Sequence, residues 1–350
     1  QMSYNYDFEG GELLDVSEIR SAGHTSSGVA RLQDMVTYTD STMSGIIEAK
    51  HIANSDISSS GNVGISTIDV YTDASISDSG TGAITFSDRI EHQVITTTVF
   101  DARGNALVQE IEKTYYDLGL AIGTDVQVIS NDPFGIHDRT TKSVIQNYEV
   151  LAGGRSFIDV QVINYLLYDR YGNAEHQTID TFDNLAATEE FLVSHKDIVN
   201  TYGAITVQNS DGTTGTRSEA FARKHGSALT TTSRETDKAG ALIQRSVTTS
   251  TLFDLRGNAI DQSTDKFVAN LAAAEKLATR TVIHNESINA RGDAGTQEIT
   301  TWTTDDAGLN IEVTSFQVMT NRRFDGRHNV LNQMSYNYDF EGGELLDVSE

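Results

Sequence analysis

Apolar and polar residues alternate with a period of two along much of this chain. Ile158, Val160 and Val162 share one side of an extended segment, and the segment 247–253 alternates in the same way. This period is typical of β-strands that are half-buried on one face. The pattern therefore predicts a chain of paired strands, each of which runs into a turn.

Four of these segments end in the same ten-residue motif. The consensus is an aromatic residue, Asp, any residue, Arg or Tyr, Gly or His, Asn, Ala or Val, two variable positions and Gln. An Asp side chain can accept backbone N–H groups two residues on, and Gly and Asn tolerate positive φ. The motif therefore predicts a tight hairpin turn. Its members are Phe100, Asp101, Gly104, Asn105 and Gln109; Tyr168, Asp169, Gly172, Asn173 and Gln177; Phe253, Asp254, Gly257, Asn258 and Gln262; and Phe324, Asp325, Asn329 and Gln333.

Each motif lies within a predicted hairpin, and the four hairpins are placed near 85–117, 155–183, 236–268 and 304–340. In the fourth motif His328 stands where the others have Gly, so this turn needs a different type or a left-handed histidine. We expect a degenerate fifth unit within residues 25–75.

Two Leu- and Ala-rich segments, 184–193 and 270–278, interrupt the strand pattern. Each begins with Asn at a plausible N-cap and continues with good helix formers. These segments predict two short helices, and edge strands are the alternative, because both return to β-type residues.

The first eighteen residues, QMSYNYDFEGGELLDVSE, occur again without change at 333–350. Residue 333 repeats residue 1, which gives a period of 332 residues. We interpret 1–332 as one unit of a tandem array and 333–350 as the start of the next identical unit. We expect the repeated segment to complete the fourth hairpin and then to begin the next unit.

Composition supports a folded β protein. The chain has a single proline and no cysteine, and its 13 Tyr and 13 Phe argue for packing. Scarce proline suits long paired strands, and the absence of cysteine excludes disulfides and thiolate chemistry. The net charge of −25 makes nucleic acid an improbable partner, and no apolar stretch is long enough for membrane insertion.

At its hairpins the chain resembles the YD-repeat, or RHS-repeat, family. The resemblance rests on Tyr168-Asp169-Arg170-Tyr171-Gly172, which matches the family's Tyr-Asp-x-x-Gly, and on closing dipeptides such as Tyr116-Asp117. It implies a long, wound, non-catalytic β-sheet, which in bacterial members forms a shell around a toxin. The hairpins here are 68–108 residues apart, wider than in that family.

Candidate chemistry is sparse. The sequence has no GxSxG, HExxH, P-loop or GxGxxG motif, and its nine histidines show no metal-ligand spacing. Asn209 with Asp211, and Asp305 with Asp306, offer oxygen ligands that suggest calcium as the only candidate cofactor. Arg291-Gly292-Asp293 is interpreted as a turn and not as an integrin ligand.

The sequence predicts a mainly β fold: an elongated β-hairpin, β-solenoid-like or sandwich-like repeat module with at most two short helices. We expect a non-enzymatic structural repeat of a bacterial extracellular or cell-surface fibre, stalk or filament, whose partner is itself through adjacent repeats. An adhesin or matrix-binding module and an RHS-like shell around a toxin are the alternatives.

Overall fold

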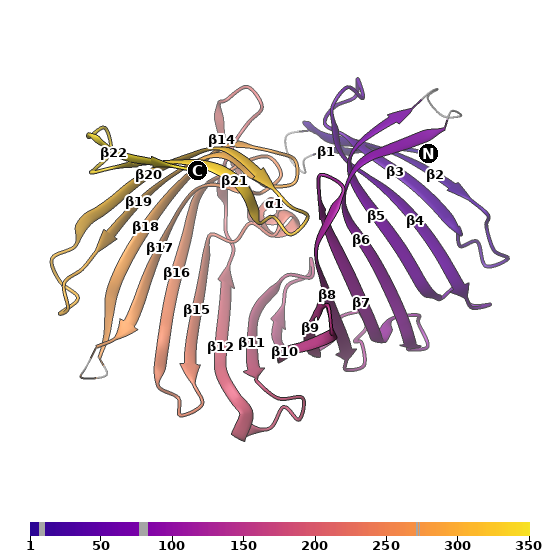
Figure 1. Cartoon of the computed structure of the whole chain (residues 1–350), viewed down its shortest axis with the longest axis horizontal. Coiled ribbons are helices and arrows are strands. Elements are labelled where there is room, and N and C mark those ends of the chain that lie inside the picture. Colours follow the sequence, from indigo (N-terminus) through magenta and orange to yellow (C-terminus); the bar gives the residue numbers. More distant parts are fainter. Residues whose placement is uncertain (7–10, 77–82, 271, 273) are drawn as a thin grey trace. The chain divides into compact units, whose positions relative to one another are not determined.

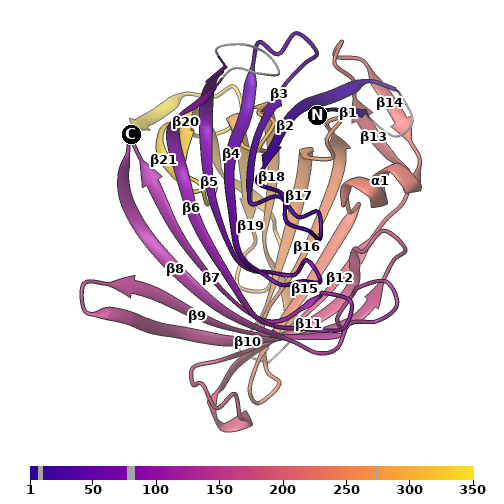
Figure 2. The ribbon, with the colours of Figure 1, turned by 90° about the vertical axis from the view of Figure 1, so that its right-hand side faces the viewer.

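The computed structural model describes residues 1–6, 11–76, 83–270, 272 and 274–350. It contains one antiparallel sheet of 22 strands (Figures 1 and 2). The chain divides into two compact units, one formed by 1–163 with 183–185 and 325–327, the other by 164–182, 186–324 and 328–350. The prediction of a mainly β chain built from hairpins is confirmed.

In the first unit the strands follow one another in the sheet in chain order, each antiparallel to the last. They are β1 (Met2–Tyr6), β2 (Leu13–Ala22), β3 (Leu32–Tyr38), β4 (Ile46–Ile57), β5 (Val63–Ile76), β6 (Ile84–Phe100), β7 (Ala106–Asp117), β8 (Leu120–Asn131), β9 (Lys142–Leu151) and the first part of β10 (Gly154–Tyr168). Figure 2 shows β4 to β8 side by side. The interval 25–75 is therefore a run of hairpins.

The second unit continues the same meander with one insertion. Its strands are the end of β10, β11 (Ala174–Phe182), β12 (Leu192–Thr201), β13 (Ile205–Gln208), β14 (Thr214–Arg217), β15 (Thr230–Asp237), β16 (Leu242–Phe253), β17 (Ala259–Ala269), β18 (Glu275–Ile288), β19 (Ala294–Thr303), β20 (Glu312–Phe324), β21 (Val330–Tyr338) and β22 (Leu345–Ser349). β12 pairs directly with β15, and the inserted β13 pairs with β14 and runs parallel to the end of β16.

Both helix predictions fail. The segment 184–193 holds a single 3₁₀ turn, η1 (Glu189–Phe191), before β12 begins at Leu192. In 270–278, Leu271 and Ala273 lie outside the described residues, and β18 occupies the segment from Glu275 onward. Strand pairing overrides the local helix propensity from Leu192 and from Glu275 onward, and because β12 and β18 each pair with a strand on both sides, neither is the edge strand of the alternative prediction.

The α-helix of the described residues, α1 (Glu219–His225), lies in the insertion, where none was predicted. Ser218 caps it by accepting a hydrogen bond from the Phe221 N–H, and Gly226 ends it with φ of 70°. Basic residues fill its last turn, where the negative end of the helix dipole favours positive charge.

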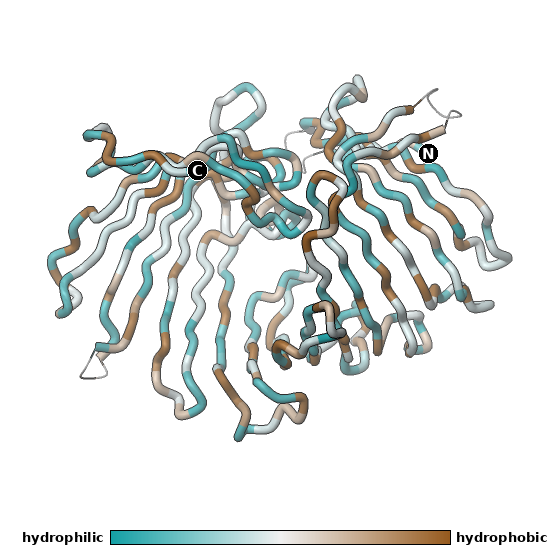
Figure 3. Tube along the Cα trace, viewed as in Figure 1, coloured by the Kyte–Doolittle hydropathy of each residue, from teal (hydrophilic) through white to brown (hydrophobic). Residues whose placement is uncertain are grey.

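Each unit has a small core. In the first unit Val36, Tyr38, Ala49 and Ala74 are buried together. In the second unit, α1 and the inserted strands bury Ile205, Val207, Phe221, Ala222 and Phe253 against one another. Most other strand residues are half-buried, and hydrophobic and hydrophilic positions alternate along the strands (Figure 3).

The predicted alternation shifts just before three of the four turn motifs. The pairing of β6 with β7, β16 with β17 and β20 with β21 is irregular in the last residues of the first strand. Thr251 is consequently exposed, whereas Ser250 and Phe253 are buried. A bulge adds a residue to one strand and so changes which side chains share a face.

Candidate functional site

Three of the four turn motifs share one backbone geometry. In the first motif the Asp101 N–H donates to the Asn105 carbonyl at 2.9 Å, and the Gly104 N–H donates to the Asp101 carbonyl at 3.1 Å. Gly104 has φ of 90°. The same pair of bonds closes 169–173 and 254–258, with φ of 101° at Gly172 and 89° at Gly257. This is a three-residue loop with a left-handed glycine.

The Asp side chain holds each of these turns from within. Asp101 Oδ1 accepts the N–H groups of Arg103 and Asn105 at 2.8 and 2.9 Å, and Asp101 Oδ2 accepts the Asn105 side-chain amide at 2.9 Å. Asp169 and Asp254 make the same three bonds within their turns. The hydrogen bond from the Asn105 side chain is the main cause that lowers the pKa of Asp101.

In the fourth motif His328 takes the left-handed conformation, with φ of 64°. Its Nδ1 lies in hydrogen-bonding contact with Asp293, and the Asp325 carboxylate accepts the Arg327 N–H at 2.8 Å. The aromatic residues that open the motifs differ in burial: Phe253 is 2% exposed, whereas Phe100, Tyr168 and Phe324 are half-buried. The closing Gln109, Gln177, Gln262 and Gln333 lie half-buried on the return strands.

The same turn geometry occurs where the motif was not recognised. The turns 58–62, 209–213, 237–241, 289–293 and 305–309 have the same two backbone bonds, each with Gly in the fourth position. A polar residue followed three positions later by Gly was the signal that could have found them. Arg291, Gly292 and Asp293 are the last three residues of the turn 289–293, so the Arg-Gly-Asp segment forms a turn as predicted. Asp293 is buried in it.

The calcium candidates lie in two of these turns. Asp211 accepts the Thr213 N–H and hydroxyl, and Asp305 accepts the N–H groups of Ala307 and Leu309. These bonds lower the pKa of both carboxyls. No group of three or more acidic, His or Cys side chains suited to a metal ion occurs among the described residues. The Asp211 and Asp305 carboxylates accept hydrogen bonds within their own turns.

Some neighbouring turns also contact one another. A Cβ added to Gly104 would lie 2.8 Å from Asn62 Oδ1, and one added to Gly292 would lie 3.1 Å from Asn258 Oδ1. The Asn105 side-chain amide donates to Asp138 at 2.9 Å. At Gly104 and Gly292, the Asn of one turn thus occupies the space beside the glycine of the next turn.

Replacing Gly257 with Ala is expected to destabilise the second unit by about 2 kcal/mol or more, because φ is 89° and the new Cβ would lie 2.7 Å from His225 Cβ. Gly212→Ala is the matched control: φ is 81°, but nothing lies within 4 Å of the new Cβ, so strain alone should cost about 1 kcal/mol. Urea unfolding followed by the fluorescence of Trp302, the single tryptophan, measures both. Equal losses would contradict the proposed collision.

Arg223 on α1 ties the insertion to the second turn motif. Its guanidinium contacts Asp169 at 3.0 Å, Glu175 at 2.6 Å and Glu219 at 2.7 Å, and it lies over the Tyr202 ring. Burial alone would lower the pKa of Arg223, but the three carboxylates together raise it. Burial likewise opposes, but does not outweigh, the hydrogen bonds from Asn173 and Arg223 that lower the pKa of Asp169.

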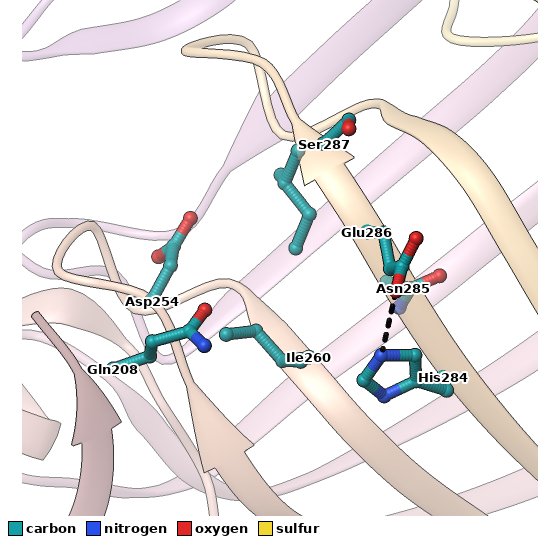
Figure 4. Close-up of a pocket in the computed structure, with 8 residues that line it drawn as sticks. Gln208, Asp254, Ile260, His284, Asn285, Glu286 and Ser287 are labelled. Carbon is teal, nitrogen blue, oxygen red and sulfur yellow. Dashed lines mark ion pairs between the residues drawn. The ribbon is translucent and has the colours of Figure 1, made fainter. Parts of the chain in front are cut away.

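The second unit contains a cleft of about 370 Å³ (Figure 4). Its lining comes from Gln208 on β13, Asp254 at the end of β16, Ile260 on β17 and residues 284–288 of β18. His284 Nε2 lies 3.6 Å from Glu286 Oε1, and His284 Nδ1 contacts Asp261 on the neighbouring strand. The Asp254 carboxylate in this cleft already accepts the hydrogen bonds of its own turn.

Sequence reasoning missed a recurrent pairing of histidine with aspartate across the sheet. The pairs are His51–Asp34, His92–Asp69, His176–Asp197, His195–Asp180, His284–Asp261 and His328–Asp293. In four of them the two residues are direct cross-strand partners. The histidines looked scattered because their partners are set by strand register and not by spacing along the chain.

Raising the pH should remove one stabilising contribution of this kind. The hydrogen bond with Asp261 raises the pKa of His284 above its ordinary 6.5. The folded chain therefore binds this proton more tightly than the unfolded chain, and the stabilisation is present below pH 6.5 and lost as the pH rises through the folded-state pKa. The difference in urea midpoint between wild type and His284→Gln should shrink across that window. An imidazole NMR titration showing no upward shift would contradict this.

The repeated eighteen residues form the same hairpin at both ends of the sequence. In the first copy Ser3 pairs with Ser17 and Tyr4 with Val16, and in the second copy Ser335 pairs with Ser349 and Tyr336 with Val348. Both copies have a register shift at the same position, between Asn and the second Tyr. We call the hairpin of β1 and β2 the first hairpin and that of β21 and β22 the second hairpin.

The two hairpins have different neighbours. In the first hairpin β2 also pairs with β3, and in the second hairpin β21 also pairs with β20. Leu14 and Val16 on β2 are 5% and 0% exposed, whereas the equivalent Leu346 and Val348 on β22 are 65% and 45% exposed. Tyr4 on β1 is 52% exposed, whereas the equivalent residue on β21 is half-buried. The apolar side chains of the second strand are therefore buried in the first hairpin and exposed in the second hairpin, whereas the Tyr at the centre of the first strand is exposed in the first hairpin and half-buried in the second.

No protein-family model matches this chain, and no curated protein matches it. Among solved structures, TcdB2-TccC3 without its hypervariable C-terminal region is similar over 100% of this chain and 22% of its own length, at 14% identity and a TM-score of 0.17. TcdB2-TccC3-Cdc42 is similar over 100% of this chain and 21% of its own length, at 14% identity and a TM-score of 0.16. The Tc holotoxin pore of Photorhabdus luminescens is similar over 96% of this chain and 20% of its own length, at 13% identity and a TM-score of 0.16.

The chain spans about a fifth of the length of these solved chains. TM-scores this low do not establish a shared fold.

Proposed function

We propose that this chain is a non-enzymatic structural module of a tandem-repeat protein, whose copies join end to end by continuing one β-sheet into a fibre, stalk or surface filament. The observation that carries the proposal is the hairpin that forms twice in one register. The second hairpin of one copy and the first hairpin of the next would be the same eighteen residues.

The two surroundings of the hairpin can be combined without conflict. β20 lies against the first strand of the second hairpin, and β3 lies against the second strand of the first hairpin. A hairpin shared by two copies would have both neighbours, so that β20 of one copy, the hairpin and β3 of the next would be consecutive in one sheet. Neither strand of the hairpin would then be an edge strand, and the exposed apolar side chains of β22 would be buried.

Charge and side-chain use support a structural role outside the cell. The net charge of −25 favours solubility, and a cysteine-free chain is insensitive to an oxidising surrounding. None of the described helices is long and apolar enough to cross a membrane. The carboxylates of the turn motifs and six of the histidines are engaged in turn and cross-strand hydrogen bonds, which suits a scaffold. We place the protein at the surface of a bacterium or outside it.

Electron microscopy of chains with two and with four tandem copies tests the proposal. We expect a rod of uniform width whose length doubles between the two. A compact bead of one 332-residue period would have a radius of gyration of about 20 Å, so small-angle scattering separates a rod from flexibly joined beads. Images or scattering curves that show compact beads joined by flexible links would contradict the proposal.

The YD-type turn 169–173 favours a second candidate function, a shell that encloses a toxin. Its expected image is different: the protein would appear as a closed, hollow particle with density inside, and adding tandem copies would enlarge the particle instead of lengthening a rod.

A further inference from the structure

β20 presents an edge that the second hairpin covers in register. Phe316 pairs with Tyr338, Val318 with Tyr336 and Thr320 with Met334. The rings of Phe316 and Tyr338 lie 5.8 Å apart. Because the second hairpin repeats the first, the side chains that β20 contacts are also present on β1, as Met2, Tyr4 and Tyr6.

β1 exposes the matching edge. It pairs with β2, and among the described residues of its own unit it pairs with no other strand. The Gln1 amino group donates to the Ile19 carbonyl, and the Ile19 N–H donates to the Gln1 carbonyl, both at 2.8 Å. In an antiparallel ladder such pairs alternate, so Ser3 also faces β2, and the N–H and C=O groups of Met2 and Tyr4 point away from it. Tyr4 thus offers a donor and an acceptor to an incoming strand.

We infer that the edge of β20 is a binding site for β1 of a second copy of this chain, and that the second hairpin is an intramolecular cap on this site. The inference rests on the proposed function, since it uses the same junction, but it requires no covalent link between copies. The expected register is Phe316 with Tyr6, Val318 with Tyr4 and Thr320 with Met2 of the second copy.

The cap explains when two chains would join. The second hairpin is tethered to β20, so its effective concentration is about millimolar, and an identical hairpin on another chain competes poorly with it. Once the cap is released, β1 of another chain is the best remaining complement. Such a contact joins different surfaces of the two chains, so it propagates head to tail into filaments or rings.

The duplicated sequence supplies a matched experiment in the full chain. Tyr336→Pro removes the N–H that faces β20 and releases the cap. Tyr4→Pro changes the same residue of the first hairpin, where the N–H faces outward and proline is tolerated at an edge. Sedimentation should give a single-chain mass for wild type and for Y4P. The average mass of Y336P should at least double as its concentration rises, and Y4P/Y336P should remain a single chain.

A labelled peptide with the sequence of 333–350 gives a second readout by fluorescence anisotropy. It should bind Y336P saturably, suppress its assembly and fail to bind wild type, and a peptide with proline at the position of Tyr336 should not bind. If circular dichroism shows that Y336P is unfolded, the milder Tyr338→Ala, with Tyr6→Ala as its control, takes its place.

Two results would overturn the inference: a folded Y336P that stays a single chain and ignores the peptide, or a Y4P/Y336P chain that assembles as readily as Y336P. If tandem chains still form uniform rods in either case, the proposed function stands and only association without a covalent link fails. Beaded tandem chains would instead count against the proposed function.

Discussion

Val16→Asp is expected to destabilise the first unit by at least about 3 kcal/mol, whereas Val348→Asp should change stability by less than about 0.5 kcal/mol. The two valines occupy the same position of identical hairpins, but Val16 lies on a strand that pairs with β3 and is fully buried, whereas Val348 is 45% exposed. An aspartate at Val16 would lose water without gaining a partner. Thermal unfolding followed by circular dichroism measures both variants.

The same pair of variants also probes the junction between copies. In a chain of two tandem copies, the valine at the junction would gain β3 of the second copy as a neighbour, so its replacement by Asp should become as damaging as V16D. Similar small effects at both valines in the single chain would show that burial by β3 does not stabilise the hairpin. A junction valine that stays tolerant would argue against the shared hairpin.

Phe253→Ala should cost about 3–5 kcal/mol, the usual effect of emptying a buried aromatic site. Phe253 opens the third turn motif and is also a member of the core cluster formed by Ile205, Val207, Phe221 and Ala222. The cavity would therefore separate α1 from β16 as well as weaken the turn. Urea unfolding followed by Trp302 fluorescence reports on this unit.

Phe100→Ala is the matched control for this prediction. Phe100 opens the first motif with the same turn geometry, but it is half-buried and lies outside both core clusters. Its loss should cost clearly less than that of Phe253, measured by thermal unfolding. If both substitutions cost the same, the aromatic residue would act through the turn and not through the core.

The hairpins could be predicted because their causes are local. An Asp that accepts the N–H groups two and four residues on, followed by a Gly with positive φ, specifies the turn 101–105 without help from distant residues. Which side chains face the core near the ends of the strands could be predicted less well, because bulges before the motifs change the face on which each residue lies. Bulges depend on the partner strand, which the sequence of one strand does not contain.

The helix and the polar pairs show two different limits. The signals of α1 were present, with Ser218 as N-cap, Glu219 in the first turn and Gly226 after the end. The helices were instead predicted in the longer Leu- and Ala-rich segments 184–193 and 270–278, which form strands and loops of the sheet. The pairs of histidine and aspartate could not be predicted at all, because a contact such as His195 with Asp180 follows from register between β11 and β12.

The order of the strands also determines how the molecule responds to tension. Outside the insertion that holds β13, β14 and α1, consecutive strands are neighbours in the sheet, so a pull on the two ends would load one outermost strand at a time and open its hydrogen bonds one after another. β13 interrupts this peeling, because its parallel pairing with β16 bridges β15 and holds that stretch together. A filament of such modules would act as an extensible tether that lengthens in steps and recoils when the load is removed.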